Sequence, residues 1–229
     1  MIRDIQEEIL KLKKEKDICI LAHCYQNPEI LEVADFTGDS FALSVKAAET
    51  KNKTVIMCGV KFMAESAKVL SPEKTVILPA PNAGCPMADM AEVEDVEEMI
   101  KKYPDAFKVC YINSSYEVKA LCDASVTSSS ALKIIKNIPN KQILFLPDQN
   151  LGGYISEFFP EKEFILWRGF CPTHHRITAE DIIKAKEEHP NVKVLSHPEC
   201  SKEVRDLSDY IGSTSGIINY ATECEDKEF

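Results

Sequence analysis

Several features are missing from this 229-residue sequence, and each absence excludes a class of protein. No stretch approaches the roughly 18 consecutive apolar residues that a membrane-spanning helix needs. The charged segment 1–16 has no apolar centre, so it is neither a signal peptide nor a membrane anchor. A surplus of positive charge is missing too, since the net charge is −10. We therefore expect neither a membrane nor a nucleic acid among the partners of this protein.

Paired-cysteine and nucleotide-binding motifs are also absent. None of the nine cysteines forms a CxxC motif, which argues against a zinc ribbon or a thioredoxin-like site. An odd number of cysteines without a signal peptide indicates a reducing compartment, the cytoplasm, rather than a disulfide framework. Residues 148–153 are predicted to form a glycine-containing turn after a strand, but they match neither GxGxxG nor a Walker sequence, so nucleotide binding has little support.

What the sequence does contain is an internal repeat with offsets of 88 and 86 residues. Three segments, beginning at Ile20, Lys108 and Lys193, each start with a short apolar run that is typical of a buried strand. A polar cluster, a helix-like stretch and an aspartate follow in each. The aligned positions are Asp35, Asp123 and Asp209; His23, Tyr111 and His197; Tyr25, Asn113 and Glu199; and Ser40, Ser128 and Thr214.

The alternation of strands and helices within each repeat predicts parallel sheets covered by helices, so the expected fold class is α/β. We expect an amphipathic N-terminal helix and three domains, at 1–85, 86–171 and 172–229. The third repeat reaches Phe229 where its next buried strand should begin. The third domain is therefore expected to be incomplete, without its last strand, helix and strand.

The polar residues of the repeat are candidates for a binding site, because ligands of α/β sheets bind beyond the carboxyl ends of the strands. If the repeats meet around an axis, six of these side chains face one ligand: His23, Tyr25, Tyr111, Asn113, His197 and Glu199. Glu199 beside His197 is a candidate general acid or base, although a surface ion pair is the simpler interpretation.

The recurring hydroxyls allow two interpretations. Ser40, Ser128 and Thr214 each precede a helix-like segment, where they could simply cap the helix or could help its N-terminus to bind an anion. We favour anion binding, because the hydroxyls recur together with the polar residues at the strand ends.

Two cysteines stand out from the others. Cys85 and Cys171 each precede a proline and lie 86 residues apart, and the same offset would place a third Cys-Pro near position ~257. Three thiolates with an open fourth position suit an iron–sulfur cluster with one exchangeable iron, or a zinc ion. Close by, His174, His175 and Arg176 precede a helix predicted to start near Thr178, and they could bind an anion or form a solvated loop.

Eight segments, in order, resemble the quinolinate synthase (NadA) family along the whole chain: AHCYQNPEI, ADFTGDS, NAGCPMADM, YINSSYEVKA, VTSSSA, PDQNLGGY, HPEC and GSTSG. The resemblance implies three similar three-layer α/β/α sandwich domains around a pseudo-threefold axis, with the active site at that axis. It implies a transferase of de novo NAD biosynthesis that condenses iminoaspartate with dihydroxyacetone phosphate to quinolinate, with release of phosphate and water. L-aspartate oxidase or aspartate dehydrogenase would supply the iminoaspartate.

The resemblance also implies roles for individual residues. Cys85 and Cys171 would be ligands of a [4Fe–4S] cluster whose third cysteine is expected beyond residue 229. Glu199, Tyr25 and His197 would be catalytic. The substrate contacts would be His23, Ser40, Tyr111, Asn113, Ser128, His197, Glu199 and Thr214. Two alternatives stay open: a truncated, cluster-free relative that binds dicarboxylates or phosphate without catalysis, and a different iron–sulfur hydro-lyase that acts on small hydroxy acids.

Overall fold

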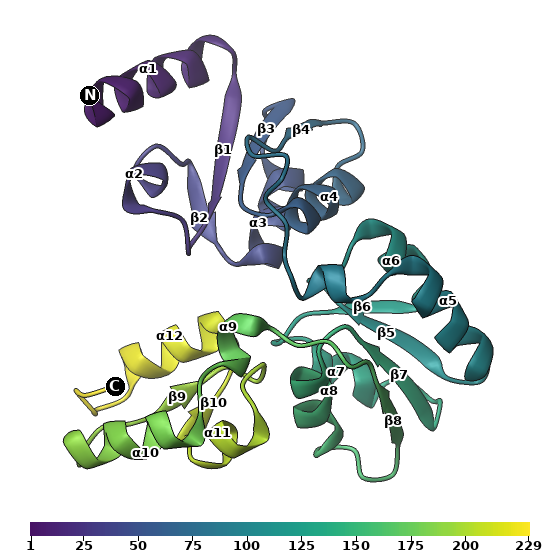
Figure 1. The fold of residues 1–229 in the computed structure, drawn as a ribbon. Helices are drawn as coiled ribbons and strands as arrows, with labels where there is room; N and C mark the ends of the chain where they lie inside the picture. Colours follow the sequence, from purple (N-terminus) through teal and green to yellow (C-terminus); the bar gives the residue numbers. More distant parts are fainter. The chain divides into compact units, whose positions relative to one another are not determined.

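The computed structural model describes residues 1–229, which form two compact units, Met1–Cys85 and Pro86–Phe229 (Figure 1). Both units are built from alternating strands and helices, and every strand pair is parallel. The predicted α/β class with short parallel sheets is therefore confirmed. The arrangement of the repeats around a threefold axis and the three domain boundaries stay predictions.

The first unit is built on one four-stranded sheet with the strand order β2-β1-β3-β4. Its central strand β1 is buried from Cys19 to Ala22, as the apolar run predicts. Figure 1 shows α3 and α4 together on one face of this sheet and α2 on the other. The elements are α1 (Ile2–Glu15), β1 (Ile18–His23), α2 (Pro28–Leu31), β2 (Phe36–Gly38), α3 (Ser40–Glu49), β3 (Thr54–Cys58), α4 (Lys61–Leu70) and β4 (Thr75–Ile77).

The second unit contains the same sheet again, with the order β6-β5-β7-β8, and a smaller sheet of β10 and β9. Each β-strand occupies the place of its repeat counterpart, so β5 corresponds to β1 and β7 to β3. The elements are η1, a 3₁₀ helix (Ala88–Met90), α5 (Val93–Lys102), β5 (Phe107–Tyr111), α6 (Tyr116–Ala120), β6 (Ala124–Val126), α7 (Ala131–Lys136), β7 (Gln142–Leu146), α8 (Gln149–Ser156), β8 (Glu163–Leu166), α9 (Pro172–His175), α10 (Ala179–Glu188), β9 (Leu195–Ser196), α11 (Lys202–Asp206), β10 (Tyr210–Ile211) and α12 (Thr214–Glu223).

The recurring aspartate has the same structural role in all three repeats. Oδ2 of Asp35 accepts the N–H of Ile20 at 2.8 Å, and the N–H of Asp35 donates to the carbonyl of Ile20 at 2.8 Å. Asp123 makes the same two bonds with Lys108, and Asp209 makes them with Val194. These bonds join the segment before the edge strand to the neighbouring central strand. The three recurring aspartates therefore stabilise the fold of each repeat.

A lysine at a helix end also recurs, buried at position 74 and half-buried at position 162. Lys74 and Lys162 lie 88 residues apart, which is the offset of the first two repeats. Nζ of Lys74 donates to the carbonyl of Ala47 at 2.7 Å, and Nζ of Lys162 donates to the carbonyl of Ile138 at 2.6 Å. Each lysine thus binds carbonyls at or just beyond the end of a helix, where a cation is favoured. The repeat is therefore present in the tertiary contacts as well as in the sequence.

The prediction of a turn at 148–153 is wrong, because helix α8 begins at Gln149 and includes Gly152 and Gly153. A Cβ atom on Gly152 would lie 2.6 Å from Cδ2 of Leu166 and 2.7 Å from Cδ1 of Phe145. Glycine at this position lets the helix approach β7 and β8 closely. It is needed for packing rather than for a turn.

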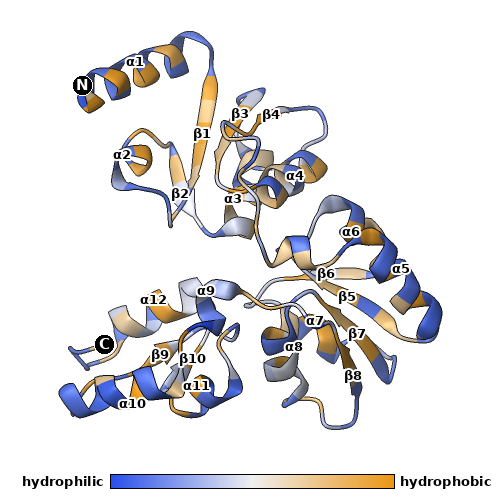
Figure 2. Cartoon of the chain, viewed as in Figure 1, coloured by the Kyte–Doolittle hydropathy of each residue, from blue (hydrophilic) through white to orange (hydrophobic).

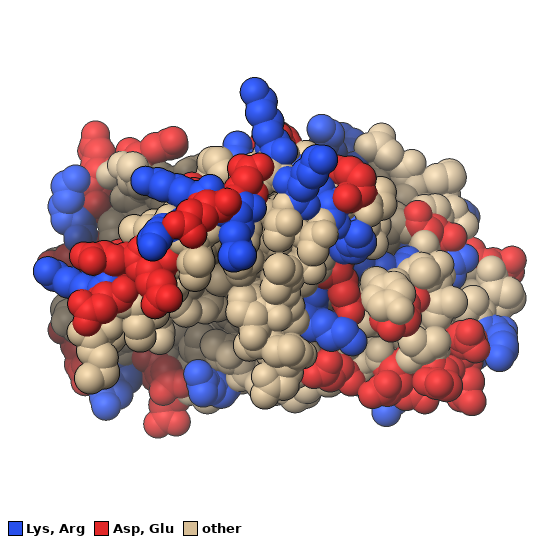
Figure 3. Space-filling view, turned by 90° about the horizontal axis from the view of Figure 1, so that it is seen from above, with Lys and Arg blue, Asp and Glu red and all other residues tan.

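The surface agrees with this layered organisation. The strands carry the most hydrophobic stretches, whereas the outer sides of the helices are hydrophilic (Figure 2). On the face seen in Figure 3, lysine and arginine side chains alternate with aspartate and glutamate rather than forming one basic patch. None of the helices combines the length and the apolar character that a membrane crossing requires.

Candidate functional site

The second unit brings three chemically different side chains together, those of Cys171, His174 and Glu199. One donor atom from each lies within 4.8 Å of the others. Cys171 precedes the short helix α9, and His174 lies three residues later on the same turn. Glu199 comes from the loop after β9. A sulfur, an imidazole nitrogen and a carboxylate oxygen are thus placed together by segments that lie 25 or more residues apart.

Glu199 and His174 form the charged part of this site. Oε2 of Glu199 lies 3.0 Å from Nδ1 of His174, and the Glu199 side chain is only 4 % exposed. The distance is that of an ion pair, but the geometry is not that of a hydrogen bond, so Nδ1 of His174 is buried without an aligned partner. We therefore treat the interaction as electrostatic.

The two groups shift each other's pKa. Burial alone would lower the pKa of His174, but the neighbouring Cys171 and Glu199 outweigh it and raise the pKa to about 10. Burial alone would raise the pKa of Glu199, but His174, His197 and Tyr111 together lower it. At neutral pH the pair is therefore an imidazolium next to a carboxylate.

His197 is also in this site, but its ring is neutral at neutral pH. Its ring stacks on that of His174 with 5.0 Å between centroids, and burial lowers its pKa to about 4, against the opposing effect of Glu199. Nδ1 of His197 accepts the N–H of Glu199 at 3.3 Å. The proton of this neutral ring must then be on Nε2, which makes His197 a hydrogen-bond donor at that atom.

The first unit contains the same hydrogen bond from a main-chain N–H to Nδ1 of a histidine. Nδ1 of His23 accepts the N–H of Tyr25 at 3.3 Å, and burial lowers the pKa of His23. The two rings pack edge to face with 4.6 Å between centroids. His23 therefore also presents a neutral ring with its proton on Nε2. His23 and His197, which align in the repeat, share one tautomer. In each case the residue two positions later donates its main-chain N–H to Nδ1 of the histidine.

Tyr111 and Ser128 complete the group in the second unit. Tyr111 is buried at the end of β5, and its hydroxyl lies close enough to Glu199 and Ser128 for both to shift its pKa. Burial and the charge of Glu199 raise the pKa of Tyr111 well above its usual value, so the hydroxyl stays protonated. Four residues predicted from the sequence thus come together: Tyr111, Ser128, His197 and Glu199.

The positions of the other predicted residues are given by their elements. Asn113 follows β5 and Thr214 begins α12. In the first unit, His23 ends β1, Tyr25 follows it, Ser40 begins α3, and Cys85 is the last residue. The structure brings Tyr111, Ser128, His197 and Glu199 together within the second unit, and the roles of all the predicted residues stay predictions.

The recurring hydroxyl residues Ser40, Ser128 and Thr214 do not cap the helices with their side chains. The side chain of Asp39, not Ser40, caps α3, and the side chain of Ser213, not Thr214, caps α12. In the second repeat the N-cap of α7 is Ser130. Simple capping by Ser40, Ser128 and Thr214 is therefore wrong, and their part in anion binding stays a prediction.

Sequence reasoning missed two participants of this site. The sequence indicates His174 only as part of a segment that could bind an anion or form a solvated loop, although its position three residues after Cys171 is an available signal. Asp148 is fully buried, and burial together with the charge of Glu199 raises its pKa to about 7. Because the sequence predicts a turn at 148–153, it does not connect Asp148 with Cys171.

Comparison with known proteins identifies the family. The family described as quinolinate synthetase A protein matches residues 7–229. This chain belongs to that family. Among its relatives named quinolinate synthase, the protein of Clostridioides difficile (strain 630) is 59% identical over 100% of this chain. That of Clostridium perfringens (strain 13 / Type A) is 58% identical over 99% of this chain, and that of Caldicellulosiruptor bescii is 55% identical over 100%.

The match covers 75% of the length of each of these three relatives, so about a quarter of each has no counterpart in this chain. A reductase structure from Plasmodium falciparum, of E-1-hydroxy-2-methyl-but-2-enyl-4-diphosphate, matches with a TM-score of 0.29 and 15% identity. That likeness is too low to carry an argument.

The donor set of Cys171, His174 and Glu199 fits a transition metal. Iron and zinc accept thiolate, neutral imidazole and carboxylate ligands in proteins, and these three groups lie within 4.8 Å of one another. A metal bound here would displace the proton of His174. The buried Nδ1 of His174 without an aligned hydrogen bond is consistent with a ligand at this place. Of the two predicted cluster ligands, Cys171 lies in this set and Cys85 lies in the first unit.

Proposed function

We propose that this protein is a quinolinate synthase that condenses iminoaspartate with dihydroxyacetone phosphate, releasing phosphate and water, in the biosynthesis of NAD. The observation that carries the proposal is the buried carboxylate of Glu199, held 3.0 Å from the imidazole of His174 and beside the sulfur of Cys171. Relatives with the name quinolinate synthase at 55–59% identity support it. The assignment of the substrates is part of the proposal.

The condensation needs several proton transfers, and Glu199 is the group placed to perform them. It is ionised at neutral pH and lies between the imidazolium of His174 and the hydroxyl of Tyr111, so it can accept a proton from the substrate and return it. His197 donates a hydrogen bond from Nε2 without changing its charge. We propose that it orients a substrate carboxylate.

Substrate orientation is shared with other residues of the repeat. We propose that Ser128 and Asn113 in the second repeat, Thr214 in the third, and His23, Tyr25 and Ser40 in the first unit contact the substrates, with Tyr25 close to the reacting atoms. Neutral histidines, hydroxyls and an amide are suitable donors for carboxylates and a phosphate. The imidazolium of His174 adds the positive charge that a dianionic substrate requires.

We propose a [4Fe–4S] cluster as the cofactor, with Cys85 and Cys171 among its ligands. An iron with an open coordination position would act as a Lewis acid toward a substrate hydroxyl or carboxylate. Nine free cysteines suit a reducing compartment, so we place the protein in the cytoplasm. Iminoaspartate would be supplied by an oxidation of aspartate, for which L-aspartate oxidase and aspartate dehydrogenase are the candidates.

The test is quinolinate formation by the protein from the full open reading frame, prepared without oxygen and reconstituted with iron and sulfide. Glu199→Gln is expected to lower kcat by about 100- to 10,000-fold, the usual contribution of a general acid or base. The iron and sulfide content is measured in the same preparations, so that a loss of cluster is distinguished from a loss of proton transfer. Glu187→Gln is the matched control, because Glu187 is exposed on α10. Iron-free, colourless protein after reconstitution, or full activity of Glu199→Gln, would contradict the proposal.

The cluster-free alternative has one observation in its favour, since the cationic His174 and the donor His197 can bind a dicarboxylate without metal. Titration calorimetry of metal-free protein with succinate separates the two functions. Tight binding without metal, combined with no quinolinate formation after reconstitution, would establish a binding protein instead of an enzyme.

A further inference from the structure

Asp148 has a more elaborate set of contacts than a helix cap needs. Its carboxylate is fully buried, and Oδ1 accepts the N–H groups of Asn150 and Leu151, both at 2.8 Å. These two bonds are the normal N-cap of α8. Oδ2 accepts a third N–H, that of Cys171, at 3.1 Å. One carboxylate therefore joins the start of α8 to the main chain of a predicted metal ligand.

The loop before Cys171 is held against this carboxylate by the backbone as well. The N–H of Gln149 donates to the carbonyl of Gly169 at 2.8 Å. A Cβ atom at position 169 would lie 2.4 Å from the carbonyl oxygen of Pro147, so only glycine permits this close approach. The position of Cys171 is thus determined by contacts with the segment 147–149.

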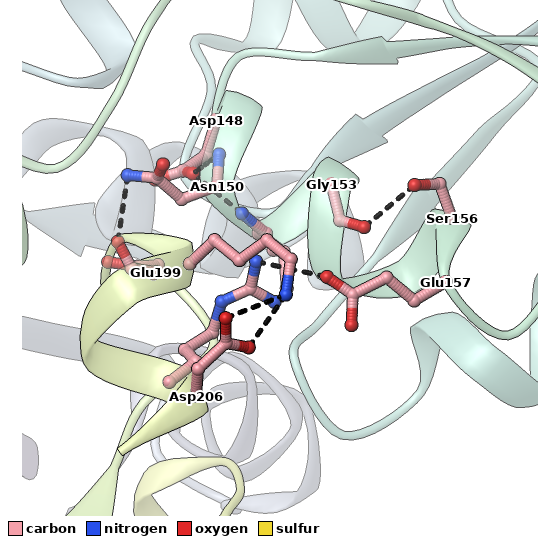
Figure 4. A network of polar contacts seen from close by, with 10 residues as sticks. Asp148, Asn150, Gly153, Ser156, Glu157, Glu199 and Asp206 are labelled. Atoms are coloured by element: carbon pink, nitrogen blue, oxygen red, sulfur yellow. Dashed lines mark hydrogen bonds and ion pairs between the residues drawn. The ribbon is translucent and has the colours of Figure 1, made fainter. Parts of the chain in front are cut away.

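Asn150 extends the connection to Glu199. The main-chain N–H of Asn150 is bound by Asp148, and its side-chain Nδ2 donates to the carbonyl of Glu199 at 3.0 Å. Figure 4 shows Asn150 between Asp148 and Glu199, with its amide directed at the Glu199 main chain. Asp148 is therefore bonded directly to the Cys171 segment and, through one residue, to the Glu199 segment.

The first repeat shows that the fold itself does not need this carboxylate. The position of Asp148 corresponds at the 88-residue offset to Val60, which precedes α4 and makes no side-chain cap. The backbone bond recurs there, since the N–H of Lys61 donates to the carbonyl of Ala83 at 2.8 Å. The same local fold thus forms with valine. Burial of a carboxylate is costly, so its presence in the second repeat calls for another reason.

We propose that Asp148 is a positioning residue that holds the thiol of Cys171 and, through Asn150, the carboxylate of Glu199 at the distance at which both serve the same ligand. This inference rests on the proposed function for the identity of that ligand, an iron of the cluster with its substrate. The segment 148–153, which matches no nucleotide-binding motif, would then have the role of positioning Cys171 and Glu199. Outer contacts of this kind orient metal ligands, and their loss typically lowers metal affinity by about 10–100-fold.

The test uses Co²⁺ as a probe on the cluster-free full chain, because a sulfur-to-cobalt charge-transfer band reports the bond to a cysteine sulfur. Cys171→Ser in the unsubstituted chain identifies the band that belongs to Cys171. Asp148→Asn keeps the Oδ1 acceptor of the cap but presents an amide N–H to the N–H of Cys171. We expect this variant to bind Co²⁺ about 10–100-fold more weakly, with a diminished band.

Thr178→Ala is the matched control. Thr178 caps α10 with a complete capping box and makes no hydrogen bond to Cys171 or Glu199, so the variant loses a helix cap that does not contact either residue. It should lower the Tm at least as much as Asp148→Asn does, while its Co²⁺ affinity stays at that of the unsubstituted chain. Equal weakening of Co²⁺ binding in both variants would show a general structural effect and would overturn the proposal.

Asn150→Ala provides a second measurement if Asp148→Asn does not fold. It keeps the main-chain N–H that Asp148 binds and removes only the bond to Glu199. Weaker Co²⁺ binding with the sulfur band retained is expected. Unchanged Co²⁺ affinity in either variant, or no cysteine-dependent Co²⁺ binding by the unsubstituted chain, would overturn the proposal. The readout involves no substrate, so a failure of quinolinate formation is a separate result.

Discussion

Oε2 of Glu199 lies 3.0 Å from Nδ1 of His174, in a site where the carboxylate is almost completely buried. The sequence separates the two residues by 25 positions, and the structure makes them one charged pair. His197, stacked on His174, remains neutral. Two adjacent imidazoles of this site thus differ in charge, since His174 is cationic and His197 is neutral.

His174 should remain protonated and His197 neutral throughout the range from pH 5.5 to 8, because their pKa values are about 10 and about 4. Nitrogen NMR of the imidazoles can resolve this, since the chain has only five histidines. His197 should show an unprotonated Nδ1 and a protonated Nε2. Glu199→Gln should lower the pKa of His174 toward its usual value of 6.5, because a main source of negative charge is lost. Titration of His174 near pH 6.5 in the unsubstituted chain would refute the assignment.

His197 should make the protein less stable in weak acid. Its pKa is about 4 when folded and near 6.5 when unfolded, so the unfolded chain binds the proton more strongly. This stability is fully present above pH 6.5 and is lost as the pH falls through the window from 6.5 to 4. Each pKa unit corresponds to about 1.4 kcal/mol, which gives a loss of about 3 kcal/mol for this group.

Urea unfolding at several pH values measures this loss. His197→Gln removes the titrating group, so the free energy of unfolding should depend less steeply on pH between 6.5 and 4. His189→Gln, at an exposed position after α10, should leave the slope unchanged. Equal slopes in all three proteins would show that His197 is not the group responsible.

Adjacent glycines in α8 should respond oppositely to alanine. Gly152→Ala places a methyl group 2.6 Å from Leu166 and 2.7 Å from Phe145, so the variant should lose about 1–3 kcal/mol of stability through overpacking. In Gly153→Ala the nearest atom is 3.9 Å away, an ordinary contact. That variant should gain about 0.5–1 kcal/mol, because alanine favours a helix more than glycine. Chemical denaturation compares the two, and equal effects would contradict the packing argument.

The three recurring aspartates, Asp35, Asp123 and Asp209, should each contribute similarly to the stability of the protein. Asp123→Ala leaves the N–H of Lys108 without its acceptor, and Asp35→Ala and Asp209→Ala do the same to Ile20 and Val194. Each loss is expected to cost about 1–3 kcal/mol, measured by the urea midpoint. Asparagine at the same positions keeps an acceptor and should cost less. Asp105→Ala, an exposed aspartate outside these three, is the control.

Much of the fold followed from local sequence pattern. The apolar runs at Ile20 and Lys108 predicted buried strands, and β1 and β5 include them. The recurring aspartates predicted a repeat, and each makes the same pair of main-chain bonds. The helix starts at Ser40 and Thr214 were also predicted, but the capping residues were not: Asp39 and Ser213 cap the helices, one residue before the aligned hydroxyls. Competing polar residues next to each other cannot be ranked as caps from the sequence alone.

Part of the group around Glu199 could be expected from the sequence. Repeat alignment singles out His197, Glu199, Tyr111 and Ser128, because each lies at or just after the carboxyl end of a strand, and their roles in binding and catalysis stay predictions. It missed His174, which has no partner at the corresponding place in the first repeat. It also missed Asp148, because an aspartate before a pair of glycines favours a turn as readily as the start of a helix.

The sequence by itself determined the α/β class, the repeat and the residue types available for chemistry, because strand and helix patterns depend on neighbours a few residues apart. Only the tertiary structure decided which of these residues act together. Cys171, His174 and Glu199 meet because the ends of different elements meet, and Asp148 reaches Cys171 because glycines at 152 and 169 let two segments approach closely. Charge states follow from the same cause: burial and proximity, which no local pattern records, make one histidine cationic and keep its neighbour neutral.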